Sequence, residues 1–214
     1  MRKTLLILAM LVGAAPAQAQ DRPTLLPVRD VVVEYLTSGI IPGPAGELTN
    51  TVMVRYASDR DRLRVDGPYG RFYAIVDIDA ERMLIVMPGQ RIYATQPADR
   101  AIMAMFKAGN TAFRRIGAET VAGLRCTVYD AALNDRTGQV CLTDDGVLLR
   151  ASIEDPDRHP ELEAVRVTYT RQPERLFEIP PGFQKLDMPN LPYGMNLGPL
   201  DGPPGGYPAG PFGR

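Results

Sequence analysis

The sequence predicts a mainly β (α+β) protein built on an antiparallel sheet. Between Val28 and Met188, apolar and polar residues alternate with a period of two, which is typical of strands with one buried face. The segments with this pattern follow one another through short turns. Short turns connect antiparallel neighbours, whereas parallel neighbours need long crossovers. Only one segment has the pattern of a helix, and the sequence shows no internal repeat.

Six strand-like segments occupy the first half of this region, and we expect them to form a meander. In the first segment Val31, Val33 and Tyr35 fall on one face. Turn signals at residues 77–80 and at Pro88–Gly89 separate the later segments. The six segments are residues 28–39, 47–59, 61–68, 71–77, 82–88 and 91–96.

The predicted helix covers residues 97–110, PADRAIMAMFKAGN. It has a proline near its start and a glycine near its end, as helix termini favour. Ile102, Met105 and Phe106 share one stripe, and we expect this stripe to pack on the sheet.

The only two cysteines, Cys126 and Cys141, lie in a stretch with the pattern of one β-hairpin. A turn at Leu133–Asn134 sets Cys126 directly opposite Cys141, and Val128 opposite Gln139. Opposed residues on neighbouring strands can form a disulfide, which here closes a loop of about 15 residues and adds ~3 kcal/mol. The alternative is a redox or metal pair, but the spacing is not the CxxC of redox motifs.

The N-terminus has the pattern of a cleaved secretory signal peptide. Arg2 and Lys3 precede an apolar run over residues 5–15, and the small residues Ala17 and Ala19 predict cleavage after Ala19. The alternative is a membrane anchor, which needs about 20 apolar residues, more than this run supplies. We therefore expect an exported, periplasmic or secreted protein without a membrane-spanning segment.

The predicted organisation is a signal peptide at 1–19, a linker at 20–27, one domain at 28–188 and a tail at 189–214. The tail holds seven prolines and seven glycines in 26 residues, so we expect it to be disordered. The chain after Ala19 carries 22 Lys and Arg against 25 Asp and Glu, a formal net charge of −3. Without a basic stripe, this composition argues against nucleic-acid binding.

Three stretches resemble the lipoprotein localisation factor (LolA-like) superfamily, nearest to a family of uncharacterised exported bacterial domains. They are GAETVAGLRCTVYD at 117–130, RLFEIPPGFQKLDM at 175–188, and the region 64–94. The resemblance implies a strongly curved antiparallel sheet forming an unclosed half-barrel, with one or two short helices plugging the concave side. In characterised relatives the concavity holds acyl chains or a lipoprotein. No position of this sequence matches a known functional residue of the superfamily.

The segment RMLIVMP at 82–88 is apolar on both faces, so each face must be covered by a helix, a plug or a ligand. Methionine side chains suit apolar surfaces that tolerate ligands of different shape, although they also fill irregular cores. Both uses stay open at this point, and Arg71, Arg91 and Tyr93 are candidates for the mouth of a cavity. The predicted ligand-facing wall consists of Met83, Ile85, Met87, Ile102, Met105 and Phe106.

Catalytic and metal-binding patterns are missing from the sequence. The single histidine, His159, lies in a charged turn without a catalytic partner, and the sequence has no GxSxG or HExxH motif. We expect no enzyme activity, no cofactor and no metal. The predicted function is a periplasmic binding module for a lipid, an acyl group or another apolar ligand, with a lipoprotein as a further candidate partner. The alternative is an envelope interaction or structural module that recognises a protein through the sheet and the tail.

Overall fold

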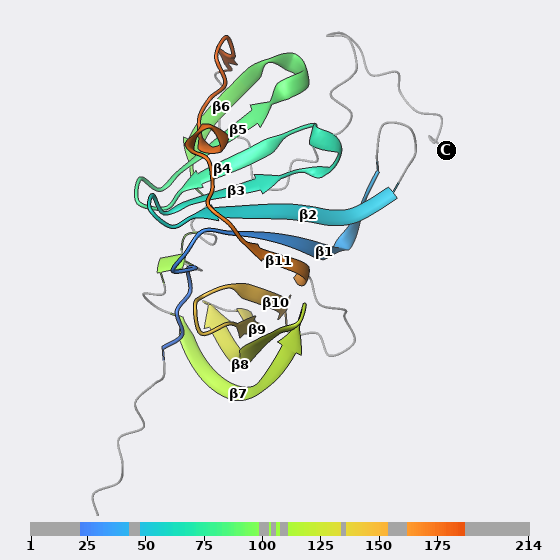
Figure 1. The fold of residues 1–214 in the computed structure, drawn as a ribbon, viewed down its shortest axis with the longest axis vertical. Coiled ribbons are helices and arrows are strands. Elements are labelled where there is room, and N and C mark those ends of the chain that lie inside the picture. Colours follow the sequence, from blue (N-terminus) through green and yellow to red (C-terminus); the bar gives the residue numbers. More distant parts are fainter. Residues whose placement is uncertain are drawn as a thin grey trace, which may run out of the picture.

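The structure, a computed structural model, describes residues 22–42, 48–98, 103, 106–107, 111–133, 136–153 and 162–186. Within these residues twelve strands form one sheet in the order β12-β6-β5-β4-β3-β2-β1-β11-β10-β9-β8-β7 (Figure 1). The strands are β1 (Val31–Pro42), β2 (Leu48–Ala57), β3 (Arg62–Asp66), β4 (Tyr73–Asp77), β5 (Arg82–Met87), β6 (Ile92–Pro97), β7 (Ala112–Val121), β8 (Leu124–Leu133), β9 (Arg136–Leu142), β10 (Leu148–Ile153), β11 (Leu162–Tyr169) and β12 (Gln184–Lys185).

The sheet consists of two antiparallel meanders, as the short turns predict. Strands β1 to β6 form the first meander and β7 to β11 the second, and antiparallel pairing of β1 with β11 joins them. The expectation of a wholly antiparallel sheet is wrong at β12, which pairs parallel with β6. After β11 the chain crosses the sheet and then runs beside β6 as β12. Leu186, directly after β12, donates its backbone N–H to the Tyr93 carbonyl at 2.7 Å.

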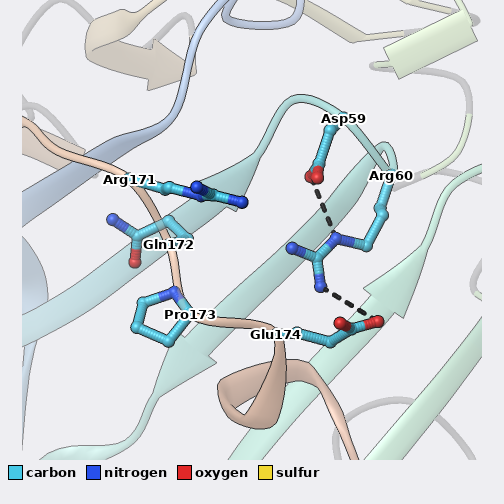
Figure 2. A pocket seen from close by; sticks show the side chains of 6 residues that line it. All are labelled: Asp59, Arg60, Arg171, Gln172, Pro173 and Glu174. Carbon is cyan, nitrogen blue, oxygen red and sulfur yellow. Dashed lines mark hydrogen bonds and ion pairs between the residues drawn. The ribbon is translucent and has the colours of Figure 1, made fainter.

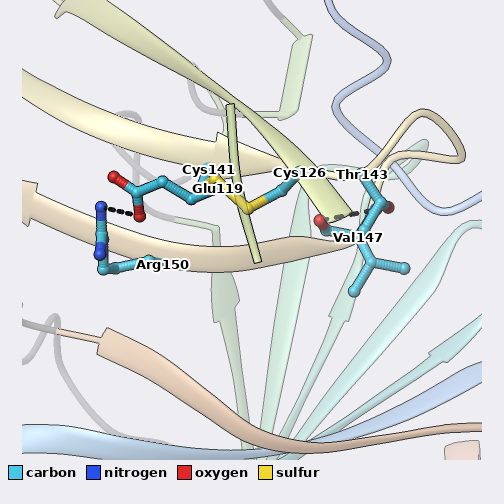
Figure 3. Close-up of a disulfide and its surroundings, with 6 residues drawn as sticks. All are labelled: Glu119, Cys126, Cys141, Thr143, Val147 and Arg150. Atoms are coloured by element: carbon cyan, nitrogen blue, oxygen red, sulfur yellow. Dashed lines mark hydrogen bonds and ion pairs between the residues drawn. A yellow bond between two sulfur atoms is a disulfide. The ribbon is translucent and has the colours of Figure 1, made fainter. Parts of the chain in front are cut away.

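The sheet is curved and is not closed, because its edge strands β7 and β12 do not pair with each other. In the second meander Glu119 on β7 forms an ion pair of 2.5 Å with Arg150 on β10, across the two intervening strands (Figures 1 and 3). This confirms the mainly β, unclosed architecture. The face that carries this ion pair and the core is called the inner face, and the opposite one the outer face.

Helices contribute little to the described part of the chain. It contains the short 3₁₀ helices η1 (Pro68–Gly70), η2 (Pro88–Gln90) and η3 (Glu174–Phe177). The expected helix does not begin at Pro97, because Pro97 belongs to β6 and Ala98 is not helical. Of the remaining residues only Met103, Phe106 and Lys107 are described, and these three are helical. The helical plug of the concave side therefore stays a prediction.

The main core lies on the inner face and joins the two meanders. Val31, Val33 and Tyr35 are buried there, which confirms the face assigned to them from the alternation. They share one cluster with Leu149 and the two cysteines of the second meander. Burial of β-branched and aromatic side chains in strands is the main source of stability for such a sheet.

A second apolar cluster covers the outer face of the first meander. Phe177 of η3 is buried in it, against Ile75 of β4 and Val86 of β5. Arg64 fixes η3 in place, because its guanidinium donates to the Leu176 carbonyl at 2.6 Å. Residues 170–186 cross the outer face in this way (Figure 1). The doubly apolar strand β5 is therefore covered on its outer face by the chain's own closing segment.

The N-terminal residues of the described chain rest on the turn between β9 and β10. The Val28 N–H donates to the Asp145 carbonyl at 3.0 Å, and Leu26 packs against the main core. Gly146, in this turn, has φ +86°, and a Cβ placed on it would lie 2.1 Å from the Leu26 carbonyl oxygen. The sequence analysis did not anticipate the contact of this turn with residues 24–28.

Candidate functional site

An unbroken aliphatic row runs across the inner face, perpendicular to the strands. Each member pairs with the next across neighbouring strands, from β11 through β1 to β6. Cross-strand partners project from the same face, so these side chains form one continuous surface. The row consists of Val167, Val33, Val54, Val65, Ala74, Ile85 and Ala94.

The centre of this aliphatic row is less buried than the positions on either side of it. Val33 and Ala94 are each only 3% exposed. The four members between them on β2 to β5 are half-buried: Val54, Val65, Ala74 and Ile85. The centre of the row is therefore an apolar strip that the described chain covers only in part. A strip of this kind has no polar group to orient a ligand and would attract one by apolar burial alone.

The structure brings three residues of the predicted ligand-facing wall together. Met83 is buried in the main core, and Ile85 and Phe106 pack against the same cluster. Met87 is buried at the end of β5, opposite Ile92. Ile102 and Met105 lie outside the described residues. Whether these side chains face a ligand stays a prediction.

The residues proposed for a mouth do not gather on the inner face. Tyr93 packs in the outer-face cluster with Phe177, so it does not line the aliphatic row. Arg71 and Arg91 are exposed in the turns before β4 and β6. Arg91 adopts the left-handed conformation with φ 54°, which ends η2. We therefore assign no mouth role to Tyr93.

A polar depression of about 570 Å³ lies between the β2–β3 turn and the segment that leaves β11 (Figure 2). Arg60 bridges its two sides, since its guanidinium lies 2.9 Å from Asp59 and 3.6 Å from Glu174. Figure 2 shows Arg171 on the side opposite Arg60. The two arginines and two acidic residues of the lining balance in charge and are partly exposed, so the depression has the character of a structural junction. The lining residues are Asp59, Arg60, Arg171, Gln172, Pro173 and Glu174.

Asp30 connects the two sides of this junction, the end of β2 and the segment that leaves β11. Its carboxylate accepts hydrogen bonds from the Ser58 N–H at 2.8 Å, the Ser58 hydroxyl at 2.9 Å and the Gln172 N–H at 2.6 Å. Burial alone would raise the pKa of Asp30, but the hydrogen bonds from Gln172 and Ser58 outweigh it and lower the pKa. Sequence analysis missed this residue, because its partners are far apart along the chain.

The disulfide between Cys126 and Cys141 is present, with a Cα–Cα distance of 5.4 Å (Figure 3). The expected register is wrong by two residues, since Cys141 pairs with Val128 and not with Cys126. A shift of two leaves every side chain on the same face, so both sulfurs still point inward and bond diagonally. The turn lies between Leu133 and Arg136, one position beyond the place assumed.

No three His, Cys, Asp or Glu side chains within the described ranges are grouped closely enough to hold a metal ion. His159 lies outside those ranges. The helices that the structure describes include none with the length and apolar character needed to cross a membrane.

Comparison with known proteins supports the fold and does not assign a family. No protein-family model matches the chain, and no curated protein matches it in sequence. An uncharacterised conserved protein from Thermus thermophilus has a similar structure, with a TM-score of 0.50 and 12% identity over 74% of this chain and 90% of that chain. The complex of MucA and MucB from Pseudomonas aeruginosa matches with a TM-score of 0.44 and 14% identity, over 70% of this chain and 55% of that chain. At these identities the likeness concerns the arrangement of strands alone.

Proposed function

We propose that the protein is a non-enzymatic binding module of the bacterial envelope, a LolA-like half-barrel that holds a lipid acyl chain or another apolar group on its inner face. The observation that carries this proposal is the half-buried centre of the aliphatic row, from Val54 to Ile85. The resemblance of the sequence to the LolA-like superfamily supports the same function.

The physical reason is that the empty strip leaves apolar surface in contact with water, which is unfavourable. Apolar surface removed from water contributes roughly 25 cal/mol per Å², so an apolar chain laid along four half-buried aliphatic side chains gains affinity without any directed bond. Such a surface discriminates little between apolar ligands of similar width. We therefore infer a class of ligand, apolar chains, and the strip does not specify a single member of this class.

Export is part of the proposal. Disulfides persist in oxidising compartments, and the Cys126–Cys141 bond fits the periplasm better than the cytosol. We propose that residues 1–19 are removed on export, so that the mature chain begins at Gln20. The intact mass of the protein recovered from the periplasm tests this, and retention of residues 1–19 would contradict it.

The test of ligand binding is a native mass spectrum of the purified protein, followed by lipid extraction and titration with a fluorescent fatty acid. We expect an added mass that is lost on denaturation, and saturable binding of the probe. Ile85→Gln places an amide in the centre of the aliphatic row and should weaken probe binding. Val165→Gln is the matched control, because Val165 is 44% exposed and lies outside the row. No adduct and no probe binding by the wild type would refute the proposal.

A second function, protein recognition, is favoured by the open edge of the sheet at β7, whose residues 114–120 are exposed. The C-terminal tail at 189–214 was the other expected recognition element, and it lies outside the described residues. Deletion of the tail tests that expectation: co-purifying proteins should be lost while the ligand content stays the same.

A further inference from the structure

Among the described residues no strand pairs with the outer side of β7, which is a long edge of the sheet and comes near β11 in part. Of its ten residues, Ala112 and all of 114–120 are exposed, and only Val121 is buried. At the opposite end of the sheet, the short edge strand β12 pairs with β6 and covers part of it. An exposed edge strand offers unpaired backbone groups, and proteins usually shorten or cover such edges. Here the edge is long and carries only a bulge near Ile116.

The turn that ends β7 determines which backbone groups point to the open edge. Ala122 and Gly123 both have positive φ, 49° and 77°, as in the type I′ turn of a two-residue hairpin. In such a hairpin Val121 and Leu124, which flank the turn, form a hydrogen-bonded pair. Because hydrogen-bonded and non-bonded pairs alternate, Ala118 and Thr120 direct their N–H and C=O groups away from β8, to the open edge.

The charged side chains of this hairpin divide between its two faces. On the face that carries the disulfide, Arg114 forms an ion pair with Asp130, and Glu119 forms one with Arg150. The charges of this face are therefore compensated within the molecule.

The opposite face of the hairpin carries two uncompensated guanidinium groups. Arg115 pairs across the ladder with Tyr129, and Arg125 pairs with Thr120, so both arginines share the face turned away from the disulfide. Neither forms an ion pair with any residue that the structure describes. The two arginines therefore form a local positive patch, although the formal net charge of the whole chain is −1.

The bulge fixes the spacing of these two charges. Arg115 and Thr120 are five positions apart on β7, but their β8 partners, Tyr129 and Arg125, are only four apart. One residue is therefore absorbed by the bulge. A strand added to the open edge would meet the two guanidinium groups at a spacing of four residues, which keeps both contacts on one face of that strand.

We propose that the β7 edge binds an extended segment of another protein by strand addition, and that acidic residues four positions apart in this segment pair with Arg115 and Arg125. Backbone hydrogen bonds to Ala118 and Thr120 supply affinity, and the two arginines supply the preference for acidic sequences. A second copy of this chain fits less well, because pairing β7 with β7 would gather four guanidinium groups on one face.

The test measures fluorescence anisotropy of a labelled nonapeptide, Thr-Val-Glu-Val-Thr-Val-Glu-Val-Thr, added to the intact chain. We expect saturable binding and slower hydrogen exchange of the Ala118 and Thr120 amides. Ala118→Pro removes an outward N–H while it leaves the β7–β8 ladder intact, and it should weaken binding at least tenfold. The double variant Arg115→Glu/Arg125→Glu should have a similar effect.

Two controls separate this site from general charge attraction. Arg82→Glu/Arg175→Glu makes the same change of net charge at exposed positions of the first meander and η3, and it should bind like the wild type. A peptide with lysines in place of both glutamates should not bind. The surface charge variants do not disturb the core, so they remain informative if Ala118→Pro does not fold.

The proposal is overturned if the wild type does not bind the peptide, if both β7 variants bind it as the wild type does, or if the control variant loses binding equally. Self-association that Ala118→Pro abolishes would assign the edge to a second copy. Binding of phosphatidylglycerol vesicles without binding of the peptide would assign the arginines to a membrane surface. Either result also overturns the proposal.

Discussion

Alanine at position 146 should destabilise the protein far more than alanine at position 123. Both glycines lie in hairpin turns with a left-handed backbone, φ +86° at Gly146 and φ +77° at Gly123. They differ in their surroundings. A Cβ on Gly123 would meet nothing within 4 Å, whereas a Cβ on Gly146 would lie 2.1 Å from the Leu26 carbonyl oxygen. Gly123 is therefore a matched control for the backbone conformation.

The expected magnitudes follow from these contacts. Either substitution costs about 1–2 kcal/mol for placing alanine in the left-handed region. At Gly146 the backbone near Leu26 must also move, because a carbonyl oxygen cannot give way as a flexible side chain can. This displaces the Val28–Asp145 hydrogen bond, worth about 1 kcal/mol, and the half-buried Leu26 side chain, worth about 1 kcal/mol more. The difference between the two variants should be about 2 kcal/mol.

Urea unfolding followed by circular dichroism and tyrosine fluorescence measures this difference, since the chain has no tryptophan. In thermal unfolding, 2 kcal/mol corresponds to about 4–8 °C for a chain of this size. Hydrogen exchange at the Val28 amide should become faster in Gly146→Ala and stay unchanged in Gly123→Ala. Equal destabilisation of both variants would show that residues 24–28 do not press on this turn, and would refute the reasoning.

Three further predictions concern the covalent and packing contacts. Replacing Cys126 and Cys141 together by alanine should lower the free energy of unfolding by ~3 kcal/mol, as expected for a 15-residue loop, and unchanged urea unfolding would contradict this. Hydrogen bonds hold the folded-state pKa of Asp30 below its unfolded value, so its stabilisation is present above about pH 4 and is lost as the pH falls through the folded pKa. Asp30→Asn should therefore cost about 2 kcal/mol at pH 7 and flatten the acid limb of a stability–pH curve, and an unchanged limb would argue against this role. Phe177→Ala should cost about 3–5 kcal/mol because Phe177 is 3% exposed, whereas Ile179→Ala, at a position 42% exposed, should cost less than about 1 kcal/mol in the same unfolding assay.

The strand pattern and the disulfide could be predicted from the sequence because both depend on short-range order. Alternation placed Val31, Val33 and Tyr35 on the buried face, since period two fixes which side chains share a face. The predicted Cys126–Cys141 disulfide is confirmed although the predicted register was wrong, because a shift of two residues keeps both side chains on one face.

The remaining features depend on contacts between distant segments, which periodicity does not encode. The closing segment at 175–188 resembled the LolA-like superfamily, but neither its motif nor its apolar residues indicated that Phe177 packs onto β4 and β5. The parallel pairing of β12 follows from the path of that segment, and the Asp30 junction requires three distant parts of the chain to meet. The aliphatic row was only partly visible, because its members come from seven strands whose registers the sequence did not specify.

The joint between β1 and β11 has a consequence for the order in which the molecule assembles. Val31 pairs with Tyr169, so the first long strand finds its partner only after nearly the whole domain has emerged. The hairpins on either side can form from local segments, but this joint must close a very long loop, which is slow. We expect the two meanders to form first and to dock last. Until then β1 is a second open edge, and in that interval the chain is most exposed to aggregation and to capture by chaperones.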